Sequence, residues 1–277
     1  MKNMWLRSVA LPALLVSPAF AADMSVKAPL APSTPAYNWT GFYVGLNAGG
    51  DWARSGDPTT SASCAAAPGF GGGSNFACGD IAAVNALGTG GMSGSGFTGG
   101  AQAGYNWQVN STVVGGEIDF EDFHGKASRA ATGTLPISGA QATITNSVDA
   151  DWLVTARGRV GWLFNNNLLA YATGGLAITH LSSSNSYVDN LGGFGPDVGS
   201  WTASQNKAGW TAGAGIEYAL GQHWSARAEY LYVHFDPISA SGVVANTGIA
   251  AGGYGSAIST STDMSAHIAR AGVNYKF

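Results

Sequence analysis

Nine charged side chains occur at alternating positions of short segments whose other residues are small or apolar. Glu117, Asp119 and Glu121, for example, alternate with Ile118 and Phe120. Such carboxylate and guanidinium groups could form ion pairs, relay a proton or line an ion path. Because side chains of a strand point to opposite faces with a period of two, each segment would have one charged and one apolar face. The full set is Glu117, Asp119, Glu121, Arg157, Arg159, Glu217, Arg227, Glu229 and Arg270.

We interpret this set as an ion-pair network that points into a common interior. It contains five acids and four arginines, and a buried charge without a partner carries a penalty of several kcal/mol, so pairing is the structural expectation. Asn47, Gln102 and Asn106 would add hydrogen bonds. A proton path, an ion path or a gate is the functional alternative.

Other residues with chemical potential are few. Cys64 and Cys78 are the only cysteines, and in an oxidising compartment an isolated pair predicts a disulfide, with free thiols or a metal pair as alternatives. The five histidines show no metal-ligand spacing such as His-x-x-x-His, so we expect no metal and no cofactor. We also expect no catalytic residues. An enzyme would need a cluster built from Asp122, His124, His234 and His267.

The elements that must position these residues are strands. From Trp39 onward, segments with period-two alternation recur, and the spacers between them are alternately long and short. Short turns and long loops of this kind, with both chain ends on the short-turn side, are typical of bacterial outer-membrane barrels. The sequence therefore predicts an all-β, eight-stranded antiparallel up-and-down transmembrane β-barrel over residues 39–277. The predicted strands lie near 40–52, 96–108, 112–123, 148–164, 168–181, 207–219, 224–236 and 264–277.

Residues 1–21 read as a secretory signal peptide, because a basic start with Lys2 and Arg7 precedes a short apolar run and an Ala19-Phe20-Ala21 exit. Residues 22–38 are rich in Pro, Ala and Ser and are expected to form a flexible periplasmic lead-in. The chain contains no run of about 18 apolar residues that could form a spanning helix. We therefore expect export to the outer membrane of a Gram-negative cell, where an integral protein must be a barrel.

Composition excludes several other classes. Charged residues are 10% of the chain, against about 25% in an ordinary soluble domain. Lys and Arg are few and unclustered in a chain of formal net charge -4, which argues against nucleic-acid binding. A soluble glycine-rich β protein is the remaining structural alternative, and it would partition into the aqueous phase.

Aromatic residues test the barrel model quantitatively. Trp152 and Trp162 share a strand face and are ten residues apart. At about 3.3 Å per residue and a tilt near 45°, they are separated by about 23 Å in height, close to the apolar band of such barrels. In 168–181, facing Leu176 and Ile178 toward lipid turns Tyr171 inward. The predicted aromatic girdle comprises Phe97, Trp107, Trp152, Trp162, Trp210, Tyr218, Tyr275 and Phe277.

Four segments carry a resemblance to a known family. NWTGFYVGLNAGG from Asn38, YATGGLA from Tyr171, GWTAGAGIEY from Gly209 and the ending VNYKF from Val273 together resemble strands of the porin-family outer-membrane β-barrel proteins of alphaproteobacteria, the small OmpA-like surface antigens. The resemblance implies an eight-stranded outer-membrane barrel that supports envelope integrity and surface contact. The terminal Phe277 also resembles the signal that the barrel assembly machinery reads.

These observations lead to one expected function and two alternatives. We expect a non-enzymatic integral outer-membrane barrel, surrounded by lipid and lipopolysaccharide, whose extracellular loops contact the outside and could meet an external ligand. The first alternative is a narrow diffusion channel for small solutes, which requires an open lumen. The second is a barrel enzyme acting on lipid or peptide, which requires the rim cluster named above.

Overall fold

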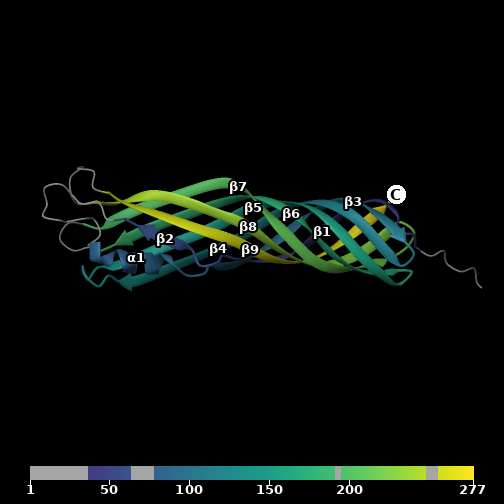
Figure 1. Ribbon diagram of the computed structural model, residues 1–277, viewed down its shortest axis with the longest axis horizontal. Coiled ribbons are helices and arrows are strands. Elements are labelled where there is room, and N and C mark those ends of the chain that lie inside the picture. Colours follow the sequence, from purple (N-terminus) through teal and green to yellow (C-terminus); the bar gives the residue numbers. More distant parts are fainter. Residues whose placement is uncertain (1–36, 64–77, 191–194, 248–254) are drawn as a thin grey trace, which may run out of the picture. The chain divides into compact units, whose positions relative to one another are not determined.

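The computed structural model describes residues 37–63, 78–190, 195–247 and 255–277. Eight long strands form a closed antiparallel ring, because each pairs with the next in the chain and the first, β1, also pairs with the last, β9 (Figure 1). The prediction of an eight-stranded up-and-down barrel is confirmed. The ring strands are β1 (Gly41–Arg54), β3 (Ser93–Val109), β4 (Thr112–Thr134), β5 (Gln141–Asn165), β6 (Leu168–Asp189), β7 (Asp197–Ala219), β8 (Trp224–Asn246) and β9 (Gly255–Lys276).

Two small elements lie in the first long connection. The short strand β2 (Thr59–Ala62) pairs with β9, and the helix α1 (Ile81–Gly88) follows a 3-10 turn at Cys78–Asp80. Within the described ranges, no helix is both long and apolar enough to cross a membrane. The predicted signal peptide (1–21) and nearly all of the predicted lead-in (22–38) lie outside the described residues.

The barrel has two distinct ends, which we call the turn end and the loop end. At the turn end, β3 and β4, β5 and β6, and β7 and β8 are joined by connections of a few residues. Asn110 has a positive φ of 55° in the first of these turns, a conformation that asparagine tolerates better than most residues. In the second turn, the Asn165 side chain accepts hydrogen bonds from the backbone N–H groups of Asn167 and Leu168.

The strands extend further at the loop end than the sequence predicted. β4 continues to Thr134 instead of ending near 123, and β8 continues to Asn246 instead of ending near 236. In these extensions most outward residues are polar, with exceptions such as the exposed Val243, and cross-strand hydroxyl pairs such as Ser241 with Ser259 at 3.1 Å occupy positions of the outer face. The sequence did not predict these extensions because the hydrophobic alternation inverts there, so that apolar side chains point inward instead of outward.

Side chains fill the barrel interior in four layers. Starting from the turn end, these are a small apolar and aromatic cluster, the charged network, a larger apolar cluster and a second apolar cluster that includes α1. The first layer contains Tyr37 and Trp39, which precede β1 and are buried in the barrel mouth. Tyr37 thus packs against the barrel, although the sequence placed it in a flexible lead-in.

Candidate functional site

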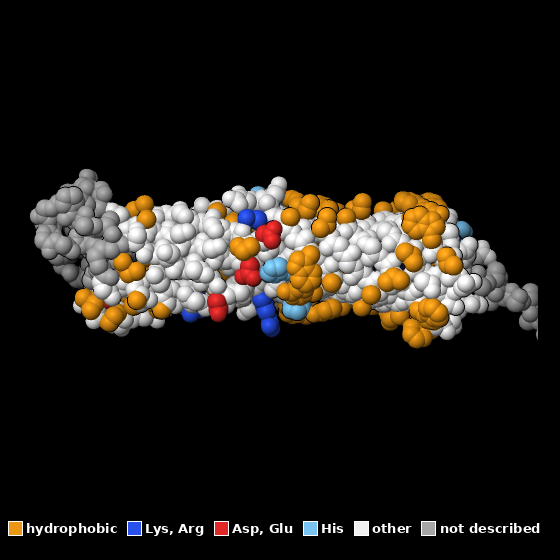
Figure 2. All heavy atoms as spheres, viewed as in Figure 1, with side chains coloured by type: hydrophobic (Ala, Val, Ile, Leu, Met, Phe, Trp, Pro, Cys, Tyr) orange, Lys and Arg blue, Asp and Glu red, His pale blue; other side chains and the backbone are white. Residues whose placement is uncertain are grey.

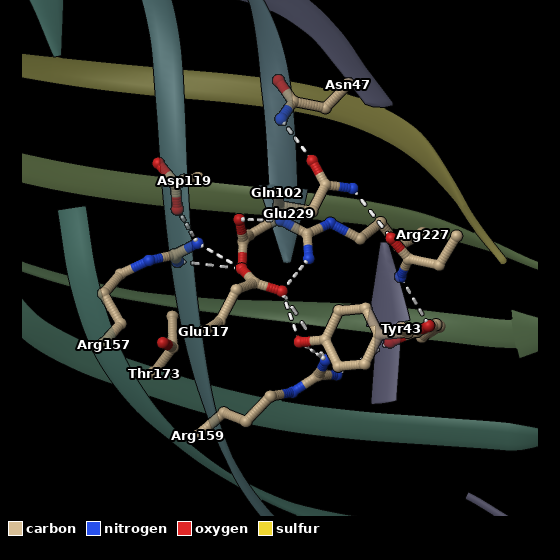
Figure 3. Close-up of polar contacts among 12 residues, drawn as sticks. Tyr43, Asn47, Gln102, Glu117, Asp119, Arg157, Arg159, Thr173, Arg227 and Glu229 are labelled. Carbon is tan, nitrogen blue, oxygen red and sulfur yellow. Dashed lines mark hydrogen bonds and ion pairs between the residues drawn. The ribbon is translucent and has the colours of Figure 1, made fainter. Parts of the chain in front are cut away.

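All nine of the charged residues identified in the sequence point into the barrel. Each is at most 5% exposed, and they are contributed by β4, β5, β7, β8 and β9. Figure 3 shows the central members converging between the strands. The period-two alternation places them on one face of each strand, and closure of the ring brings those faces together.

Arg157 lies at the centre of this network. Its Nη2 atom is 2.5 Å from Glu117 Oε1 and 2.6 Å from Asp119 Oδ2, and its Nη1 atom is 3.1 Å from Glu229 Oε1. The Nε–H group donates a hydrogen bond to Thr155 Oγ1 at 3.0 Å. One guanidinium group therefore joins three carboxylates from two different walls of the barrel.

The other three arginines complete the pairing. Arg227 contacts Glu117 at 2.5 Å and Glu229 at 3.1 Å, and Arg159 contacts Glu217 at 2.8 Å. Arg270 pairs with Glu229 at 2.6 Å, and it also pairs with Glu121 and Asp119. Each of the five acids consequently contacts at least one arginine, which is the arrangement that offsets the cost of removing these charges from water.

Neutral side chains connect the network to β1 and β6. The Tyr43 hydroxyl donates to Glu117 Oε2 at 2.6 Å, and the Tyr171 hydroxyl donates to Glu229 Oε1 at 3.1 Å. The Arg159 guanidinium also lies 4.0 Å from the centre of the Tyr171 ring, a cation–π contact. Tyr43 was not among the sequence-derived candidates, although it shares a strand face with Asn47 and could have been found from that parity.

A chain of amides extends from the network toward β3. Asn47 Nδ2 donates to Gln102 Oε1 at 2.6 Å, Gln102 Nε2 donates to Asn274 Oδ1 at 2.8 Å, and Asn274 Nδ2 donates to Glu217 Oε1 at 2.8 Å. The structure thus places Asn47 and Gln102 in the hydrogen-bonded interior. Asn106 is buried there too, but its side-chain oxygen has no hydrogen-bond partner.

Above the charged layer, toward the loop end, the interior becomes apolar. The inward face of β8 continues from Arg227 and Glu229 to Leu231, Val233 and Phe235, all of which are fully buried. Phe123, Leu153, Leu181, Met264 and Ile268 face them from other strands. The charged filling was predicted from the sequence, but this apolar layer was not, although the same parity on β8 indicates it.

The helix α1 lies over this apolar filling at the loop end. Val84 is completely buried in the last apolar cluster. The carbonyl oxygen of Gly88 accepts hydrogen bonds from Thr60 and Asn146, and that of Leu87 accepts one from Arg129. The free carbonyl groups at the helix end are thereby satisfied by the barrel wall.

Outside the barrel, none of the predicted girdle residues is buried. Phe97, Trp107, Trp162, Trp210, Tyr218 and Phe277 are exposed, and Trp152 and Tyr275 are half-buried. On the face drawn in Figure 2, hydrophobic side chains cover the half nearer the turn end, and charged and imidazole groups lie at their border. The orientation of β6 follows the same rule, since Leu176 and Ile178 point outward and Tyr171 points inward.

The residues required for a catalytic rim cluster do not meet. Asp122 and His124 lie 3.8 Å apart on β4 and are both exposed. His234 and His267 belong to β8 and β9. In the ring, β1 and β3 separate β4 from β9, and three strands on either side separate β4 from β8. For the predicted disulfide, Cys64 lies outside the described residues, so the pair with Cys78 is not tested.

Comparison with known proteins identifies similar sequences and folds. Residues 9–277 match the family model described as "Outer membrane protein beta-barrel domain". The "31 kDa outer-membrane immunogenic protein" of Brucella melitensis is 34% identical over 236 residues, covering 84% of this chain and 86% of the relative. The "25 kDa outer-membrane immunogenic protein" of Brucella abortus is 25% identical over 221 residues, covering 78% and 77%. Among solved structures, OprG from Pseudomonas aeruginosa matches with a TM-score of 0.39 and 14% identity, covering 87% of this chain and 98% of that one.

Proposed function

The chain belongs to the outer membrane protein β-barrel family, and on that premise we propose that it is a non-enzymatic barrel with a sealed lumen that supports envelope integrity and presents its loop end outside the cell. In barrels of this kind the short turns face the periplasm and the long connections face the exterior. The turn end is therefore the periplasmic end. Two similar proteins carry the description of outer-membrane immunogenic proteins, which supports exposure of the loop end at the cell surface.

The filling of the interior is the observation that carries the sealed lumen. An eight-stranded barrel has an interior only just wide enough for side chains. Here that space holds paired charges, then apolar side chains, then α1, and the residues named for each layer are buried. A diffusion channel for small solutes would need an open path through all of these layers, so the packing favours the sealed barrel over that alternative.

Recordings in planar bilayers test this proposal. Purified protein, shown to be folded by its altered migration on an unboiled gel, should produce no reproducible unitary current steps after insertion. A channel-forming porin inserted under the same conditions is the control for the recording. Regular steps from the wild-type chain would reject the sealed lumen and favour the diffusion channel.

The envelope role requires a separate experiment in cells. A strain that lacks the protein should become more sensitive to detergents, and expression of the wild-type chain should restore resistance. We attribute this effect to the barrel as a rigid membrane component, because no lipid or peptide hydrolysis is expected. A deletion strain that tolerates detergent as well as its parent would contradict the envelope part of the proposal.

A further inference from the structure

Two adjacent cross-strand rows on the outer surface bring aromatic, imidazole and guanidinium groups together where the ring closes. In one row Arg54 of β1 is paired with Ser265 of β9, which faces His234 of β8 and then Trp210 of β7. In the neighbouring row, on the turn-end side, Trp52 is paired with His267, which faces Tyr232. We call these seven residues the belt-edge patch.

Four rings of the belt-edge patch, those of Trp210, His234, Tyr232 and His267, form a connected series. The Trp210 ring is centred 5.3 Å from Tyr232 and 6.1 Å from His234, and the Tyr232 ring is 5.2 Å from His267. Trp52 and Trp210 are each 49% exposed. The hydroxyl of Tyr230 is hydrogen-bonded to His267 Nδ1, which holds that imidazole ring in place on the surface.

The height of the patch places it at the outer edge of the apolar belt. On β8, His234 is ten residues from Trp224, an exposed aromatic residue near the turn end. That separation corresponds to about 23 Å of height at the usual strand rise and tilt. Directly beyond the patch, toward the loop end, outward positions carry hydroxyl groups, as in the Ser239–Ser261 pair. Figure 2 shows this border, where imidazole and charged groups adjoin the hydrophobic belt.

Arg54 differs from Lys126, another exposed cation of the outer surface. Lys126 lies 3.3 Å from Asp149 on the β4–β5 side of the barrel. Within the described residues, no carboxylate lies within 4.0 Å of the Arg54 guanidinium. The nearby Asp263 already accepts a hydrogen bond from the Gly56 backbone. The patch therefore offers an exposed cation that has no ion-pair partner in the described protein.

We propose that the belt-edge patch binds the phosphorylated sugar headgroup of an outer-leaflet glycolipid, an inference that rests on the proposed orientation with the loop end outside. Arg54 pairs with a phosphate group through its planar fork of donors. Trp52, Tyr232 and Trp210 present apolar ring faces to the sugars, with polar edges available for hydrogen bonds. Bound there, the glycolipid spans β7, β8, β9 and β1, and it stabilises the closed ring by mass action.

Native mass spectrometry of the detergent-solubilised full chain tests this site. The probes are diphosphoryl lipid A and the same lipid with both phosphates removed. We expect the wild-type chain to retain one diphosphoryl lipid, and Arg54→Ala combined with Trp210→Ala to weaken its binding by about tenfold. The control is Lys126→Ala, which removes an exposed cation from the opposite wall and should leave binding unchanged.

Three outcomes overturn the site. They are equal binding of the phosphorylated and dephosphorylated lipids, equal losses in the control and the double variant, and displacement of the lipid by inorganic phosphate at matching concentration. The unboiled gel measures whether each variant is folded. We expect all of them to fold, because none of the changed residues belongs to the interior network. Because binding is measured in detergent, its failure is distinguishable from an open lumen or from a missing envelope phenotype.

Discussion

At the scale of single residues, the interior is organised by arginine geometry. A guanidinium group presents five donors in a rigid fork and keeps its charge, so one side chain can satisfy several carboxylates at once. Arg157 joins Glu117, Asp119 and Glu229, and Arg270 joins Glu229, Asp119 and Glu121. Lysine at the same positions would supply a point charge without this fork.

Removing Arg157 should therefore be costly. In Arg157→Ala, three buried carboxylates lose a shared cation, and we expect the free energy of unfolding to fall by about 3–5 kcal/mol. Urea unfolding of the refolded barrel, followed by the unboiled gel, measures this change. Lys126→Ala, which breaks an exposed pair, should cost at most about 1 kcal/mol. Similar small losses in both variants would contradict a dry network.

Asp197, at the loop end of β7, gives a prediction for pH dependence. Its carboxyl group is buried, and Oδ2 has no hydrogen-bond partner. Burial, with a further contribution from Asp189, raises the pKa of Asp197 to about 6. Because the folded pKa lies above the ordinary value near 4, the stability from this group is fully present below about pH 4 and is lost as the pH rises through about 6.

We accordingly expect the wild-type barrel to melt at a higher temperature at pH 5 than at pH 7.5. Asp197→Asn keeps an oxygen for the hydrogen bond from Asn246 but cannot ionise, so it should raise the melting temperature at pH 7.5 and reduce the difference between the two pH values. Asp151→Asn, at an exposed position, is the control. An unchanged pH difference in Asp197→Asn would disprove this assignment.

At the scale of elements, β8 shows how a strand can reverse its pattern along its length. In β8 the inward face is charged at Arg227 and Glu229 and apolar from Leu231 to Phe235. The outward face is apolar at Ala226 and Ala228 and carries Ser239 and Ser241 further toward the loop end. One half of the strand is surrounded by lipid and the other by water. The same alternation therefore places charged residues inward in the first half and apolar residues inward in the second.

Close packing between β5 and β6 depends on a glycine. A Cβ atom at Gly175 would lie 2.0 Å from the Ala156 backbone oxygen, whereas at the outward-facing Gly158 the nearest atom would be 4.0 Å away. Gly175→Ala should therefore lower the free energy of unfolding by about 1–3 kcal/mol. Gly158→Ala is the matched control, with an expected change within about 0.5 kcal/mol. Urea unfolding compares the two, and equal effects would show that the sheet accommodates the added methyl group.

At the scale of the whole molecule, the barrel depends on a long-range pairing between β1 and β9. The register runs from Tyr43 with Lys276 to Arg54 with Ser265, and the backbone of Phe277 adds a hydrogen bond to Phe42. Two segments from opposite ends of the chain must therefore meet before the ring is closed. Such distant contacts carry a large loop-closure cost and favour assisted assembly.

The proposed recognition of Phe277 by the barrel assembly machinery follows at this scale. Phe277→Ser should reduce the amount of folded protein in the outer membrane of cells several-fold, while refolding of the purified chain in detergent stays nearly unchanged. Trp162→Ser, at a girdle position on another strand, is the control. Cell fractionation with unboiled gels measures both, and equal losses in the two variants would argue against a specific role of Phe277.

The sequence by itself determined the number of strands, the alternation of turns and loops, and the face on which each charge lies. These properties are local, because the period of two and the turn residues are visible in any short segment such as 117–121. It did not reveal that β4 continues to Thr134, because outside the lipid belt the outward residues are mostly polar, as at Lys126 and Thr132.

Only the tertiary structure decided which charges meet and what fills the rest of the lumen. Glu117 pairs with Arg227 across 110 residues of sequence, and this distance depends on closure, strand tilt and register together. The burial of Tyr37, Trp39 and the α1 residue Val84 has the same origin. Their partners come from strands far away in the chain, so the space that they occupy exists only once the ring has formed.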